Sequence, residues 1–134
     1  MSVKINISQY QYDQIMNNIN EILQRNIVDN TSEFEFLGVV TNGLTPRIKV
    51  SLIEQFNVMF QNLIGADHPI IVKNIINNIM FSLDSSIYGL FQIRNKNTFS
   101  ALEIKNYLYS ILSWLLDVEH NPSLLGNYLT VYDD

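Results

Sequence analysis

Between residues 70 and 84, apolar and polar side chains recur with the period of a helix. At 100° per residue, the apolar side chains fall on one half of the helix and the polar ones on the other half. The apolar half comprises Ile71, Val72, Ile75, Ile76, Ile79, Met80 and Leu83, and the polar half comprises Lys73, Asn74, Asn77, Asn78 and Asp84. Phe81 lies among the asparagines, out of pattern. The pattern predicts an amphipathic helix, capped by Asp67 and with Pro69 in its first turn.

A second amphipathic pattern follows Ser8, a residue type that favours the cap position of a helix. It predicts a helix that extends to about Arg25. Its apolar side chains fall within an arc of roughly 120°, and they are Tyr12, Ile15, Met16, Ile19, Ile22 and Leu23. Tyr10 projects from the opposite, polar face. One stripe of this helix is therefore expected to be buried.

Residues 33–52 change from a period of 3.6 to a period of 2, which is typical of strands. Asn42-Gly43 is a strong hairpin signal within them. A three-residue loop at 41–43 places Phe36 opposite Ile48 on an inner face, whereas a two-residue loop would mix charged and apolar side chains. We therefore predict an antiparallel hairpin that packs against helices, because a lone hairpin is only marginally stable in water.

Two further helices are predicted. The first runs from about Ile53 to Gly65 and carries Phe56, Met59, Phe60 and Leu63 on one side. The second spans about residues 101–119 and begins with a capping box formed by Ser100 and Glu103. It is apolar over most of its circumference, so it is either the central element of the domain or partly buried in a partner. Its apolar side chains are Ile104, Tyr107, Leu108, Ile111, Leu112, Trp114, Leu115, Leu116 and Val118.

Together these elements predict one globular domain, residues 1–134, of the α+β class and mostly α. About four helices form a bundle that packs with a small antiparallel hairpin or sheet. Residues 85–99 are expected to be a connection with a short helical turn at 87–91. Segments 3–7 and 128–132 alternate enough to be strands, and the sequence leaves open whether either one extends the sheet.

Composition departs from that of ordinary globular domains in one respect. Charged residues are 16% of the chain against about 25% in typical proteins, and Asn and Ile together make up about a quarter of it. Both residues have AT-rich codons, so an AT-rich genome, such as that of a low-GC bacterium or its virus, would explain the bias. Alternatively, the Asn-rich faces serve a function, because amides desolvate more cheaply than charged groups. Both readings stay open.

The net charge of −5 argues against a nucleic-acid partner, which would need a basic stripe. The absence of cysteine removes disulfides, thiol nucleophiles and thiolate metal sites, and it suits a reducing compartment. No secretory h-region or apolar run of about 20 residues is found. We therefore expect a cytoplasmic protein, in the host cytoplasm if it is viral, without contact with membranes.

Signatures of catalysis are missing from the sequence. The five glycines are too far apart to form a phosphate-binding loop, and only two histidines are present. His68 and His120 lie at predicted helix ends, where they favour a structural role over metal binding. Glu33 and Glu35 share a strand face, which is usually plain surface. We predict no catalytic residue, no metal and no cofactor, so the protein is not expected to be an enzyme.

Aromatic residues suggest binding instead. Seven Phe, seven Tyr and one Trp exceed what this small core needs. Exposed aromatics flanked by uncharged amides resemble protein interfaces, so the candidate partner-binding residues are Tyr10, Asn74, Asn77, Asn78 and Phe81. The main hypothesis is a small acidic inhibitor, immunity or anti-defence protein that occludes the surface of a protein partner. The alternative is a self-assembling component of a phage or viral particle, which would form a homo-oligomer through the last long helix. A third hypothesis is a small enzyme or ligand-binding protein.

Overall fold

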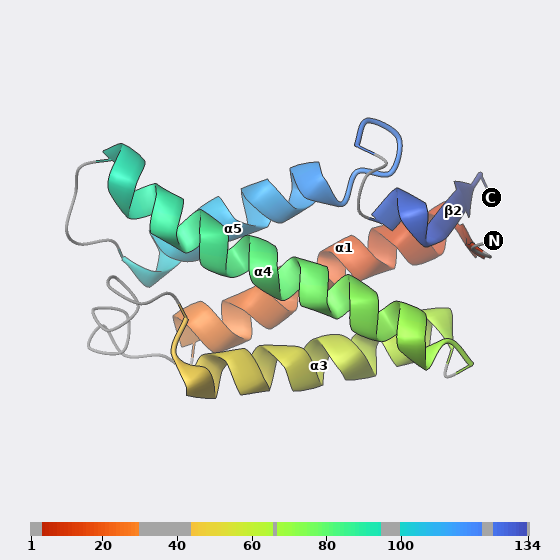
Figure 1. Ribbon diagram of the computed structural model, residues 1–134, viewed down its shortest axis with the longest axis horizontal. Coiled ribbons are helices and arrows are strands. Elements are labelled where there is room, and N and C mark those ends of the chain that lie inside the picture. Colours follow the sequence, from red (N-terminus) through yellow and green to blue (C-terminus); the bar gives the residue numbers. More distant parts are fainter. Residues whose placement is uncertain (1–3, 30–43, 66, 95–99, 122–124, 134) are drawn as a thin grey trace.

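The structure is a computed structural model of the chain, and it describes residues 4–29, 44–65, 67–94, 100–121 and 125–133. Four α-helices dominate it, and two short strands lie near the chain ends (Figure 1). In chain order, the elements are β1 (Ile5–Ser8), α1 (Gln9–Leu23), the π-helical segment η1 (Gln24–Asp29), α3 (Pro46–Ile64), α4 (Pro69–Arg94), α5 (Ala101–Leu115), the 3-10 turn η2 (Leu125–Asn127) and β2 (Leu129–Tyr132).

The helices form a bundle in which α3 and α5 each pack against both α1 and α4. Helix α4 runs diagonally across the front of the molecule, with α1 behind it (Figure 1). Helices α1 and α4 therefore lie at opposite corners of the bundle, and their outward faces point in different directions. This arrangement decides which exposed side chains can share one surface.

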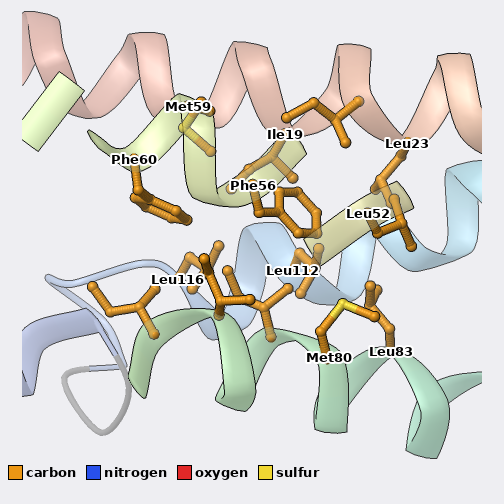
Figure 2. Packing of buried hydrophobic residues seen from close by; sticks show 14 of the residues in the cluster. Ile19, Leu23, Leu52, Phe56, Met59, Phe60, Met80, Leu83, Leu112 and Leu116 are labelled. Atoms are coloured by element: carbon orange, nitrogen blue, oxygen red, sulfur yellow. The ribbon is translucent and has the colours of Figure 1, made fainter. Parts of the chain in front are cut away.

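Apolar side chains from all four helices meet in one core (Figure 2). Phe56 and Phe60 of α3 are fully buried in it, next to Ile19 of α1 and Leu112 of α5. Burying each large apolar side chain contributes about 1.5–3 kcal/mol to folding. The buried stripes predicted for residues 9–25 and 70–84 are confirmed, except that Tyr12, Met16 and Ile71 are only half-buried against the core. The buried members are Ile15, Ile19, Ile22, Leu23, Val72, Ile75, Ile76, Ile79, Met80 and Leu83.

Helix α1 starts as predicted. The Ser8 hydroxyl accepts a hydrogen bond from the Gln11 backbone N–H at 3.1 Å, and the Gln11 side chain accepts one from the Ser8 backbone N–H at 2.8 Å. This reciprocal pair is a capping box, which supplies partners for two backbone donors that a helix start leaves unsatisfied. Helical structure then continues past Arg25 through the wider turns of η1.

The predicted hairpin is wrong in its second half. Helix α3 begins at Pro46, so residues 46–52 are helical and not a strand. The Thr45 hydroxyl caps this helix by accepting from the Ile48 backbone N–H at 3.4 Å, and Pro46 fits the first helical position, where no N–H is needed. Ile48 and Leu52 are four residues apart, a spacing that also fits a buried helix face. The first predicted strand and the 41–43 loop lie outside the described residues.

The sheet is parallel, so the predicted antiparallel arrangement is also wrong. Strands β1 and β2 pair in parallel with Ile5 opposite Leu129 and Ser8 opposite Tyr132. The two terminal segments are strands, as their alternation indicated, but they pair with each other. Alternation identifies a strand through its side-chain faces, but the backbone hydrogen bonds that join strands leave no mark on that pattern.

Helix α4 is longer than predicted, because it continues to Arg94 through most of the expected connection. Ile87 is buried four residues after Leu83 and so extends the apolar stripe by one turn. At the other end, the first helical hydrogen bond runs from the Val72 N–H to the His68 carbonyl. His68 rather than Asp67 therefore precedes the helix directly, with Pro69 in the first helical position.

Helix α5 begins at the predicted capping box, in which Ser100 Oγ accepts from the Glu103 N–H and Glu103 accepts from the Ser100 N–H. Ile104, Leu108 and Leu112 are buried, whereas Leu102 and Trp114 are exposed. The helix is thus not a central element enclosed on all sides. It packs through one side and leaves part of its apolar circumference at the surface.

Candidate functional site

The outer face of α4 carries the candidates Asn74, Asn77, Asn78 and Phe81 together with Ile70 and Lys73, all exposed. Ile70 and Phe81 each expose 74% of their surface. Residues 70, 74, 77 and 81 are spaced by four, three and four, which aligns them in one stripe along the helix. The stripe is about 16 Å long. It has an apolar side chain at each end and amides between them.

The amides of this face bond to no other described element of the fold. Asn78 donates to the Asn74 backbone carbonyl at 2.8 Å, which is a contact within the helix. Among the described residues, no hydrogen bond joins Asn74, Asn77 or Asn78 to another helix or strand. Lys73 is the one charged residue between positions 69 and 83. The face can therefore be buried against a partner without desolvating a carboxylate. Desolvating a carboxylate costs more free energy than desolvating a neutral amide.

Tyr10 does not belong to this face. It is 62% exposed at the start of α1, and its hydroxyl accepts a hydrogen bond from Gln14 Nε2 at 2.7 Å. Helix α1 is separated from α4 by α3 and α5. The structure thus brings Asn74, Asn77, Asn78 and Phe81 together and places the fifth candidate on another side of the molecule.

Ile70 and Trp114 are exposed apolar residues on or beside this face that were not among the candidates. Ile70 lies at the other end of the stripe from Phe81. Its position eleven residues before Phe81, about three helical turns, could have predicted from the sequence that the two side chains share a face. Trp114 is 65% exposed on α5, the helix packed beside α4. Its exposure depends on which side of α5 meets the bundle, and a helix apolar nearly all round does not reveal that side.

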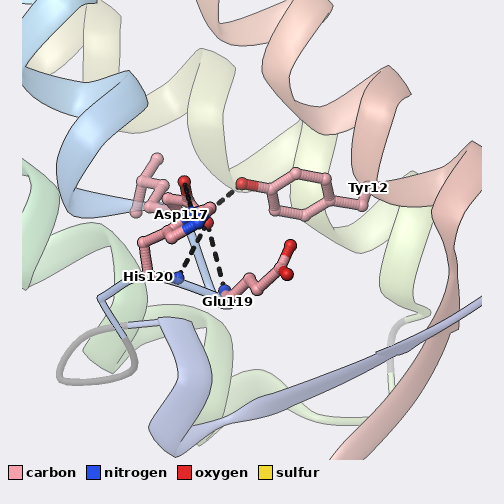
Figure 3. Close-up of polar contacts among 5 residues, drawn as sticks. Tyr12, Asp117, Glu119 and His120 are labelled. Carbon is pink, nitrogen blue, oxygen red and sulfur yellow. Dashed lines mark hydrogen bonds and ion pairs between the residues drawn. The ribbon is translucent and has the colours of Figure 1, made fainter.

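A polar cluster follows the C-terminal end of α5 (Figure 3). One carboxylate oxygen of Asp117 accepts from the backbone N–H groups of Glu119 and His120, both at 3.1 Å. Its other oxygen lies 2.8 Å from His120 Nδ1. This local turn competes with helix continuation. It explains why α5 ends at Leu115 and not at about residue 119 as predicted.

The same pair shifts two pKa values. The hydrogen bond to His120 holds the pKa of Asp117 below its ordinary value, and the backbone N–H of His120 adds to the effect. The Asp117 hydrogen bond and its negative charge raise the pKa of His120. Each group stabilises the charged form of the other. The ring of His120 thus contacts a carboxylate and not the backbone.

Tyr12 joins this cluster to α1. Its hydroxyl donates to the Leu116 carbonyl at 2.6 Å (Figure 3). Burial, followed by the nearby negative charge of Asp117, raises the pKa of Tyr12 to about 12. The phenol is therefore neutral at physiological pH. It ties α1 to the end of α5 and is poorly suited to accept or donate a proton in catalysis.

An open groove of about 520 Å³ lies beside this cluster and is lined by Lys4, Tyr12, Asp117, Glu119 and Asp133, among others. Three carboxylates face one ammonium group, so the groove is acidic. In the described parts of the chain, no group of three or more His, Asp or Glu side chains is arranged to hold a metal ion. Glu33 and Glu35 fall outside those parts.

Comparison of the chain with protein-family models, curated proteins and solved structures finds no match. Within residues 4–133, apart from the undescribed gaps, no helix is both long and apolar enough to cross a membrane.

Proposed function

We propose that this protein acts through non-enzymatic protein–protein contacts, as a small acidic binder that occludes a surface of a partner in the manner of an inhibitor, immunity or anti-defence protein. The contact surface is the outer face of α4. The observation that carries the proposal is the exposure of Phe81 on a helix face whose polar residues are almost all uncharged. We place this activity in the cytoplasm, of the host cell if the protein is viral.

The chemistry of the face supports this proposal. Binding energy at protein interfaces is concentrated in a few aromatic anchors, surrounded by weaker contacts that exclude water. Phe81 fits the anchor, while Asn74, Asn77 and Asn78 can donate and accept hydrogen bonds at its rim. The net charge of −5 favours approach to a basic partner.

Affinity capture tests the proposal. Immobilised protein is exposed to a lysate, and retained proteins are compared between the wild type, Phe81→Ala and the control Val58→Ala, which truncates an exposed side chain of α3. We expect a retained protein that Phe81→Ala releases at least tenfold more readily, as loss of an anchor of about 1.4 kcal/mol or more predicts. Equal retention by Phe81→Ala and the wild type would refute the proposed surface.

Tyr10→Ala is measured in the same assay. Because Tyr10 lies on α1, on another side of the bundle, a loss of capture by both Tyr10→Ala and Phe81→Ala would require a partner that reaches both sides. Loss by Phe81→Ala alone restricts the contact to α4.

A second candidate is a self-assembling component of a phage or viral particle. The exposed Trp114 and Leu102 on α5 favour it, since a second copy could cover the apolar side chains that the bundle leaves open. Light scattering after size exclusion tests this candidate. It predicts a stable oligomer of more than two copies that Trp114→Ala dissociates, and a protein that never exceeds a dimer contradicts it.

A further inference from the structure

We infer that the outer face of α4 pairs with the same face of a second copy of this chain, with the two helices antiparallel about a two-fold axis between Asn74 and Asn77. The inference shares with the proposed function the claim that this face makes contacts, and it names one occupant. Another protein that binds the face would compete with this dimer.

The order of residues along the stripe is symmetric. Ile70 and Phe81 are equally far from its midpoint, and so are Asn74 and Asn77. A two-fold interface requires that residue i meets residue j while j meets i. An antiparallel pair satisfies this condition by placing Ile70 opposite Phe81 of the second copy, and Asn74 opposite Asn77 of the second copy. A slip by one turn would set amides against apolar side chains, so the symmetry favours one register.

Charge points to the same face. Two chains of net charge −5 repel each other, so they meet most easily where carboxylates are absent. From residue 69 to residue 83 the sequence contains no Asp or Glu. Each Asn amide offers both donors and an acceptor, so Asn74 and Asn77 across the axis can bond to each other. An antiparallel arrangement also opposes the two helix dipoles, which a parallel pair would align.

Access and size fit a weak dimer. Helix α4 runs across the front of the bundle, so a second helix can approach it (Figure 1). A contact limited to three turns falls at or below the lower end of specific interfaces, about 1,200 Å² in total. We therefore expect a dissociation constant on the order of 10 μM. Such a dimer leaves the face available to a tighter partner.

Sedimentation equilibrium of the purified protein up to about 500 μM tests the inference, since this concentration is well above the expected dissociation constant. The variant Asn74→Lys/Asn77→Lys sets like charges opposite each other and should weaken self-association at least tenfold. In Asn74→Glu/Asn77→Lys, each Glu lies opposite a Lys of the second copy in the antiparallel register, so dimerisation should be kept or strengthened. A parallel pair would instead oppose Glu to Glu.

The control is Asn57→Lys/Gln61→Lys, which adds the same charge to an exposed face of α3 and should change self-association less than threefold. Circular dichroism confirms that each variant stays folded. The inference is overturned if the wild type remains a monomer, if the α3 control weakens the dimer as much as the α4 variant, or if the Glu/Lys variant is as monomeric as the Lys/Lys variant. The proposed function is tested separately. Even if the wild type is a monomer, it can capture a partner from the lysate and Phe81→Ala can weaken that capture.

Discussion

Two amide-rich parts of this molecule put the same residue type to different uses. In α1 and η1, amides join the helices to each other. Asn26 is buried, donates to the Ile22 carbonyl at 2.7 Å, and accepts from Ser51 and Gln55 of α3. Gln11 likewise donates to the Leu63 carbonyl at the end of α3. These amides stabilise the bundle from within.

On α4 the amides face outward. Asn74, Asn77 and Asn78 are exposed, and the one hydrogen bond given above stays within their own helix. A codon bias toward asparagine would supply amides to both regions alike. Composition therefore does not reveal which amides hold the fold together, whereas their placement in the structure does. The residues around Asn26 act on stability, whereas those around Phe81 are free to act on binding.

The largest contrast is expected between two phenylalanines. Phe56→Ala should lower the free energy of unfolding by about 3–5 kcal/mol, because it opens a cavity in the core. Phe81→Ala should change it by less than about 0.5 kcal/mol, because this side chain is exposed. Urea unfolding measures both values. A loss above about 2 kcal/mol for Phe81→Ala would mean that the ring packs within its own chain and is not an open contact residue.

The amides themselves give the next contrast. Asn26→Ala should cost about 1–3 kcal/mol, because it removes the hydrogen bond that Asn26 donates to the Ile22 carbonyl and those it accepts from Ser51 and Gln55 of α3. Asn77→Ala, on the exposed face, should be neutral to within about 0.5 kcal/mol. Thermal or urea unfolding measures the free energy of unfolding of the two variants. Similar losses would mean that Asn26 is no more important for stability than the exposed Asn77.

Ser8→Ala removes the cap at the start of α1. Loss of the hydroxyl that accepts from the Gln11 N–H should cost about 1 kcal/mol, as is usual for helix caps. Ser85→Ala on the exposed side of α4 is the matched control and should be neutral or slightly stabilising, since Ala is the better helix former. Equal effects of the two changes in urea unfolding would argue against a capping role for Ser8.

The smallest effect is expected at the exposed Asp117–His120 pair. The raised pKa of His120 means that its contribution to stability is fully present below about pH 6.5 and is lost as the pH rises through the folded-state value. The lowered pKa of Asp117 means that its contribution is present above about pH 3.8 and is lost as the pH falls through its folded-state value. The pair therefore stabilises most between about pH 4 and 6.5.

Titration of His120 by NMR measures this directly. The wild-type pKa should lie above the ordinary 6.5, and Asp117→Asn should lower it. An unchanged His120 titration in that variant would show that the 2.8 Å contact is not maintained in solution.

The fold was predictable from the sequence where one periodicity was unambiguous. The caps at Ser8 and Ser100 and the buried stripe of α4 follow from local chemistry and from the helical period. Residues 46–52 were predicted wrongly as a strand because Ile48, Val50 and Leu52 are spaced by two. Ile48 and Leu52 are also spaced by four, which fits the buried face of a helix. Thr45-Pro46 was the overlooked start signal.

The candidate site was predictable in part for the same reason. The period of α4 places Phe81 outward, and the structure has it exposed. Periodicity describes one helix at a time, so it carries no information on how α1 and α4 are arranged. The separation of Tyr10 from Phe81 depends on the packing of the intervening helices, as does the exposure of Trp114.

Crosslinking from single cysteines tests most directly whether the outer face of α4 contacts another protein chain. The natural chain has no cysteine, so Asn77→Cys on α4 and Asn57→Cys on α3 each carry one thiol, both at exposed positions, for a photoactivated benzophenone label. Labelled protein is illuminated alone at high concentration and in lysate. We expect covalent adducts, to a second copy or to another protein, from position 77 and few from position 57. Equal yields from the two positions, or none from position 77, would mean that the outer face of α4 is not a contact surface.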